Sequence, residues 1–146
     1  MSLKLLSALA EASPARLVNE LAMLGYLPRA LHAVAELGVA DFVDDAGVTV
    51  ETLAARTGTD RRALGRVLHF LATYGVFEEV DPVTFKATAL SEVLRTDHPQ
   101  SVRRSVRFYG LHWEGLGALA HSLRTGEPAF PPATGLPYFA YLAEDP

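Results

Sequence analysis

The sequence contains no cysteine and no long apolar run, and each absence excludes a class of protein. Without cysteine the chain can form no disulfide, no thiolate metal site and no thiol nucleophile. Charged or polar residues interrupt every window of the length that a membrane-spanning helix requires. The apolar stretch 1–10 is followed by Glu11 and lacks the longer hydrophobic block of a signal peptide. These features predict a cytoplasmic protein with no membrane partner.

The composition is typical of a compact soluble domain. The chain has 146 residues, of which 49% are hydrophobic and 21% are charged, so it can bury a core of its own. A formal net charge of -4 weakly opposes a nucleic-acid surface, although an average can conceal a basic face.

Capping and stop residues divide the first half of the chain into helices. Ser13 before Pro14 opens a helix whose leucines recur at helical spacing until Gly25. A second helix is expected from near Pro28 to Gly38, whose freedom at positive φ suits a C-terminal cap. Two further helices are each bounded by a cap and a glycine: Thr49 with Gly58, and Thr59 or Asp60 with Gly75.

Two strands follow these helices and complete a recognisable pattern. Residues 76–80 and 83–86 are rich in β-branched and aromatic side chains, and Asp81-Pro82 forms the turn between them. Thr88 then caps another helix through Leu94. The predicted fold is mainly α: a winged helix-turn-helix over residues 28–96 with a small β-hairpin wing, preceded by N-terminal dimerisation helices in 1–27.

Residues 97–146 are expected to form a long C-terminal helix and a connecting segment. Gly110, Gly115 and Gly117 fall within the helical stretch 101–123, where each glycine disfavours a helix interior by up to about 1 kcal/mol. We therefore expect an interruption there, and another group packed close to this backbone. Prolines after Gly126 predict irregular chain until a short helix starts at Tyr138-Phe139. They occupy positions 128, 131, 132 and 137.

The N-terminal helices carry more apolar side chains than a small helical module can cover by itself. These residues are Leu3, Leu5, Leu6, Leu9, Leu17, Leu21, Met23 and Leu24. Burial against a second copy is the expected solution, so we predict an intertwined homodimer through these helices.

The last third of the chain carries the most informative motifs. An Arg/aromatic run over 104–113 leads into a segment at 123–130, and the chain closes with Phe-Ala-Tyr-Leu-Ala-Glu-Asp-Pro over 139–146. Together with the winged-helix pattern, these motifs resemble the N-terminal half of two-domain S-adenosylmethionine-dependent O-methyltransferases of plant and actinobacterial natural-product pathways. The resemblance extends from about Leu17 to the end of the chain. It implies a domain that dimerises and contributes to the acceptor-substrate pocket.

The aromatic run supplies the candidate substrate-binding residues. They are Phe108, Tyr109, Leu111, His112 and Trp113. Aromatic surfaces with one or two polar tips suit a flat phenolic or polyketide substrate, because stacking supplies affinity and hydrogen bonds fix orientation. The resemblance implies that residues 108–111 face the acceptor. The alternative is that Phe108 and Trp113 anchor the long helix to the rest of the domain.

Cofactor-binding and catalytic residues are absent from the predicted site. The resemblance implies S-adenosylmethionine for the complete enzyme, but no glycine-rich strand-to-helix turn follows a predicted strand here. The five histidines lack metal-ligand spacing, so no metal site is expected. The resemblance places the cofactor-binding domain after Asp145-Pro146. We therefore expect the chain to be inactive alone. It is either a fragment or a stand-alone methyltransferase-like protein, which works with a separate catalytic chain or has taken on a new binding role.

A winged-helix DNA-binding regulator is the rival hypothesis. Arg61, Arg62 and Arg66 fall at the start of the second helix of the helix-turn-helix, where recognition helices contact bases. The predicted wing, however, carries acidic residues where phosphates would lie, with one lysine as compensation. These residues are Glu78, Glu79, Asp81 and Lys86. The charge pattern favours a scaffold with no nucleic-acid partner.

We predict that the chain does not retard random duplex DNA in a gel shift at low salt, because phosphate binding requires a wider basic surface than this segment offers. A shift that weakens with added salt would instead support the regulator hypothesis.

Overall fold

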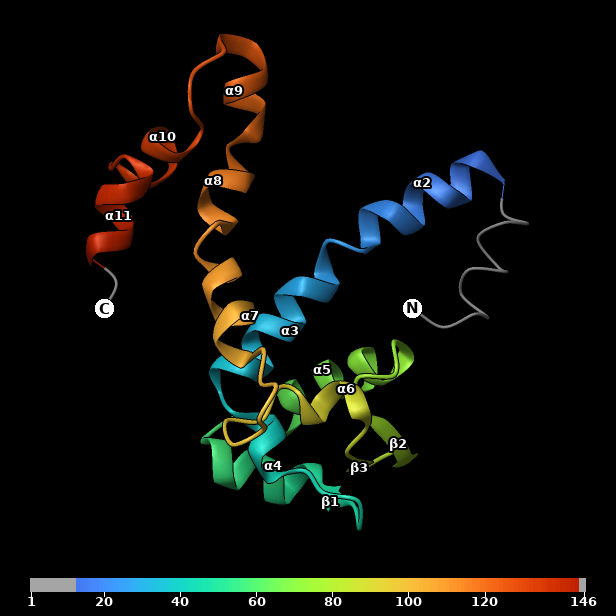
Figure 1. Cartoon of the computed structure of the whole chain (residues 1–146). Coiled ribbons are helices and arrows are strands. Elements are labelled where there is room, and N and C mark those ends of the chain that lie inside the picture. The colour runs from blue at the N-terminus through green and yellow to red at the C-terminus, as the bar shows by residue number, and fades with distance from the viewer. Residues whose placement is uncertain (1–12, 145–146) are drawn as a thin grey trace. The chain divides into compact units, whose positions relative to one another are not determined.

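A computed structural model describes residues 13–144, in which helices predominate and three short strands form one sheet (Figure 1). The chain divides into two units, the first ending at Val106 and the second beginning at Arg107. The boundary falls inside helix α7 (Arg103–Gly110). Within the described range, no helix has both the length and the apolar character needed to cross a bilayer.

The first two described helices begin close to where the capping residues predict. Helix α2 (Pro14–Met23) is capped by Ser13, whose Oγ accepts a hydrogen bond from the backbone N–H of Arg16. Helix α3 (Tyr26–Glu36) starts two residues before the expected Pro28, because Gly25 adopts right-handed helical angles and leaves only a short break. Pro28 then lies in the first turn, where a missing N–H costs nothing.

The helix-turn-helix confirms the caps and stops read from the sequence. Gly38 has φ of 65° and separates α3 from the 3-10 helix η1 (Val39–Phe42). Helix α4 (Val50–Thr57) is capped by Thr49 and stops at Gly58. Helix α5 (Arg61–Thr73) is capped by Asp60, whose carboxylate accepts the Ala63 N–H at 2.8 Å.

The wing is an antiparallel hairpin extended by a third strand. Strands β2 (Glu78–Asp81) and β3 (Thr84–Lys86) pair with each other, and β1 (Val48–Thr49) pairs with the other edge of β3. Asp81 accepts the Val83 N–H at 2.8 Å, which stabilises the turn and lowers the pKa of the Asp81 carboxyl. Strand β1 was not predicted because two residues are too few to show an alternating pattern.

Helix α6 (Ala89–Glu92) begins at the expected cap but is shorter than predicted. Thr88 and Ser91 form a capping box in which each side chain satisfies the other residue's backbone N–H. The Thr88 hydroxyl also donates to the carbonyls of Gly75 and Val76, so it joins the helix start to the chain before β2.

One hydrophobic core holds the first unit together. Side chains from α3, η1, α4, α5 and the sheet contribute to it, and its largest fully buried members are Leu53, Leu68, Leu71, Phe77 and Phe85. Burial of each such side chain contributes about 1.5–3 kcal/mol, so this cluster supplies the main driving force for the winged-helix fold.

Arg103 fastens the start of α7 to the rest of the first unit. Its guanidinium donates to the carbonyls of Ala35 and Glu36, at 2.6 and 3.2 Å, in the last turn of α3. It also donates to Asp41 Oδ2 at 3.1 Å and to the Thr96 hydroxyl. Asp41 in turn accepts the Thr96 backbone N–H at 2.6 Å. One side chain therefore satisfies helix-end carbonyls and neutralises a carboxylate at a single point.

The second unit consists of short helices. The predicted interruption of the long helix is confirmed, because residues 103–125 form α7, α8 (Trp113–Gly117) and α9 (Leu119–Thr125). Helices α10 (Phe130–Thr134) and α11 (Tyr138–Glu144) follow. The prediction of irregular chain through the prolines was wrong at α10. Pro131 and Pro132 occupy its first turn, where the backbone N–H has no partner within the helix.

We predict that Arg103→Gln lowers the free energy of unfolding by about 2 kcal/mol, because it removes charge-assisted hydrogen bonds to partly buried partners. Urea unfolding followed by far-UV circular dichroism measures the loss. Arg104→Gln, a neighbouring exposed position, is the matched control and should change stability by less than about 0.5 kcal/mol. Equal losses in the two variants would show that the Arg103 network contributes nothing specific.

Candidate functional site

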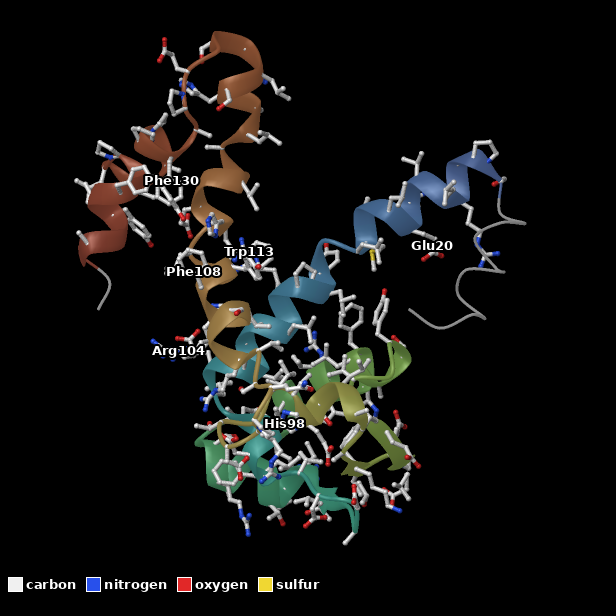
Figure 2. The ribbon with its side chains drawn as sticks, in the orientation of Figure 1. Glu20, His98, Arg104, Phe108, Trp113 and Phe130 are labelled. Carbon is white, nitrogen blue, oxygen red and sulfur yellow. The ribbon has the colours of Figure 1, made fainter. Side chains whose placement is uncertain are left out.

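The predicted substrate-binding residues lie where α7 ends and α8 begins (Figure 2). Phe108 and Tyr109 on the last turn of α7 are 45% and 63% exposed, whereas Leu111, His112 and Trp113 are half-buried. The structure brings three of these side chains together, because the rings of Phe108, Tyr109 and His112 lie within 6.5 Å of one another. This segment therefore presents aromatic surface with an imidazole among the rings.

His112 is held by hydrogen bonds on both sides of its ring. Its Nδ1 lies 3.3 Å from the carbonyl oxygen of Tyr109, and its Nε2 lies 2.8 Å from the hydroxyl of Tyr138. Tyr138 starts α11, so this contact joins the final helix to the beginning of α8. Tyr138 was not among the predicted site residues, because nothing in the sequence pattern pairs it with a residue 26 positions away.

Gly115 accounts for the close packing in the second unit. A Cβ added at Gly115 would lie 2.5 Å from Cδ2 of Phe130, so only glycine fits beneath this ring. Phe130 lies opposite α8 (Figure 2) and its ring contacts Tyr138 and Tyr141 edge-on, with centroids 5.1 and 5.2 Å apart. The expectation that a group packs close to the glycine-rich backbone is confirmed, and that group is Phe130.

A separate apolar groove of about 630 Å³ lies in the first unit, between α2, α3 and α5. It is lined by Met23, Tyr26, Arg29, Ala30, Ala33, Ala63, Arg66, Val67 and Phe70. On α2, Val18 and Leu21 are 66% and 56% exposed. Leu3, Leu5, Leu6 and Leu9 of the predicted dimer surface lie outside the described residues.

The arrangement of charges does not support the DNA-binding hypothesis. Arg61 forms an ion pair with Glu51 at 3.3 Å, and Arg66 lines the groove just described. Glu78 and Glu79 are exposed on β2, so the wing presents negative charge. Glu51 therefore offsets the charge of Arg61, and the exposed carboxylates of the wing would repel phosphates.

The described residues do not fit S-adenosylmethionine. Binding of this cofactor in a Rossmann-like site uses a glycine-rich turn between a strand and a helix of a parallel sheet. Here the sheet of residues 48–86 is antiparallel, and β1 runs directly into α4 with Thr49 as the helix cap. Gly110, Gly115 and Gly117 lie within helices rather than after a strand.

Comparison with known proteins identifies the family. The sequence profile of the O-methyltransferase dimerisation domain matches residues 19–97, which is more than half of the chain. The chain belongs to this family. The match covers the winged helix and the end of α2, which are the elements that the sequence resemblance predicted.

Individual relatives extend the likeness into the second unit. The chain is 43% identical over 120 residues to 3-amino-4-hydroxybenzoate 4-O-methyltransferase of Streptomyces cremeus, covering 81% of this chain and 33% of the relative. It matches the crystal structure of LaPhzM with a TM-score of 0.85 and 34% identity, covering 92% of this chain and 41% of that one. The chain thus spans about two-fifths or less of the relatives it matches.

A second similar structure contains ligands. It is the O-methyltransferase NcsB1 from neocarzinostatin biosynthesis, in complex with S-adenosylmethionine and 2-hydroxy-5-methyl naphthoic acid. It matches with a TM-score of 0.71 and 31% identity, covering 82% of this chain and 38% of that one.

We predict that Gly115→Ala destabilises the second unit by about 1–3 kcal/mol, because the new methyl group must displace the Phe130 ring. The fluorescence of Trp113, the single tryptophan, reports on this unit during thermal unfolding.

Gly117→Ala is the matched control for this prediction. No described atom lies within 4 Å of a Cβ at Gly117, so the change should be neutral or stabilising by up to about 1 kcal/mol. A Gly115→Ala variant as stable as Gly117→Ala would contradict the packing argument.

Proposed function

We propose that this chain is the dimerisation and acceptor-contributing part of an S-adenosylmethionine-dependent O-methyltransferase that acts on an aromatic natural product. The match to the O-methyltransferase dimerisation domain over residues 19–97 carries this proposal. The aromatic acceptors named for two of the similar proteins support the substrate class.

Phe108, Tyr109, Leu111, His112 and Trp113 line one side of the acceptor pocket in this proposal. Exposed ring surface on Phe108 and Tyr109 is available for stacking on a flat substrate. Both nitrogens of the His112 imidazole are engaged in hydrogen bonds, so this ring contributes a surface of defined orientation next to Phe108. A fixed orientation matters because transfer between two bound groups depends on their alignment.

The methyl donor is held by a catalytic domain outside the residues described here, either in a longer form of this polypeptide or in a separate chain. S-adenosylmethionine supplies the methyl group when it is bound there. The residues of this chain contribute by binding and orienting the acceptor and by excluding water from one side of it.

A homodimer through the N-terminal helices completes the proposal. Val18 and Leu21, one helical turn apart, leave apolar surface of α2 exposed, and Met23 of the same helix lines the groove between α2, α3 and α5. Burial of such a face against a second copy removes apolar surface from water at about 25 cal/mol for each Å². Family membership supports the same arrangement.

Light scattering coupled to size exclusion, at micromolar concentration, should therefore return twice the 15.8 kDa mass of the chain. Leu21→Asp should shift the population toward monomer, because it places a charge in the apolar face. Asn19→Asp adds the same charge to α2 without removing apolar surface and serves as the matched control. A single 15.8 kDa species for the unmodified chain would overturn the homodimer.

A further inference from the structure

The hydrogen bonds around His112 assign a role to Tyr138, which lies outside the aromatic segment. We infer that the Tyr138 hydroxyl oxygen accepts a hydrogen bond from a hydroxyl on the aromatic acceptor, and that it selects acceptors carrying this donor. The inference rests on the proposed function, because it concerns the substrate of the same site.

The direction of the hydrogen bonds follows from the groups involved. A carbonyl oxygen can only accept, so the 3.3 Å contact between His112 Nδ1 and the Tyr109 carbonyl assigns the proton of the neutral ring to Nδ1. Nε2 then carries a lone pair and must be the acceptor of its 2.8 Å contact with Tyr138. The Tyr138 hydroxyl therefore donates its only hydrogen to His112.

The Tyr138 hydroxyl can therefore only accept, and not donate, a hydrogen bond with a further partner. Its hydrogen is committed to His112, so its oxygen offers only lone pairs to a further partner. A phenolic O–H can satisfy those lone pairs, whereas an aryl methyl ether cannot. The half-buried position of Tyr138 increases the penalty for an unmatched polar group.

Packing holds the Tyr138 ring in this position. Phe130 contacts it edge-on at 5.1 Å, and the His112 ring lies 5.4 Å away at an angle of 34°. Phe130 is itself seated against Gly115. A hydroxyl oriented in this way is set before any ligand arrives, which favours discrimination between ligands.

Isothermal titration calorimetry of the 146-residue chain tests the inference with a matched pair of soluble probes, 6-hydroxy-2-naphthoate and 6-methoxy-2-naphthoate. The hydroxy probe should bind about three- to tenfold more tightly than the methoxy probe. Tyr138→Phe should reduce this ratio to near one by weakening the hydroxy probe. Tyr141→Phe removes a hydroxyl from the same helix and should leave the ratio unchanged.

The outcomes separate this inference from the proposed function. If the chain binds both probes and Tyr138→Phe leaves the ratio unchanged, the role of Tyr138 is overturned while the aromatic acceptor site stands. If the chain binds neither probe, the acceptor site in this chain fails and the role of Tyr138 fails with it.

The tautomer of His112 provides a test that needs no ligand. In the ¹⁵N-labelled chain, the signals that His112→Gln removes should show a protonated Nδ1 and an unprotonated Nε2. A protonated Nε2 would overturn the inference, because the Tyr138 hydrogen would then be free to be donated to a ligand.

Discussion

The guanidinium of Arg103 is the constraint on which the arrangement of the first unit depends. It closes the carbonyl end of α3, pairs with Asp41 in η1 and reaches Thr96 before α7, so the α3–η1 region and the chain leading into α7 meet at one planar group. Arginine suits this place because its fork of donors serves several acceptors at fixed angles, which a lysine ammonium cannot do. The core supplies most of the stabilising free energy, but this polar junction determines where the helix leading to the aromatic segment begins.

Local features of this fold could be predicted from the sequence. Thr49 and Asp60 cap helices because each side chain reaches a backbone N–H three residues ahead, and Gly38 and Gly58 stop helices because they adopt positive φ. All of these contacts lie within one turn, so the sequence pattern contains both partners. The glycine-rich stretch likewise predicted an interruption and a close approach, although not which residue makes it.

Contacts between distant residues could not be predicted in the same way. Arg103 and Asp41 are 62 positions apart, and His112 and Tyr138 are 26 positions apart. Neither pair follows a helical or strand period, because the intervening chain decides whether the two residues meet. Helix α10 was missed for a different reason: prolines suppress helices in general, but in a first turn they are compatible with one. The candidate segment was thus chosen from the sequence alone, and the contact of His112 with Tyr138 on α11 came from the structure.

The contact between Gly115 and Phe130 also bears on how such proteins diverge. The two positions share a single volume, since the ring occupies the space that any side chain at 115 would need. Enlargement at one position therefore requires a compensating reduction at the other. We expect these two sites to change together during evolution. A larger residue at position 115 in α8 should occur with a smaller side chain at position 130, next to Tyr138.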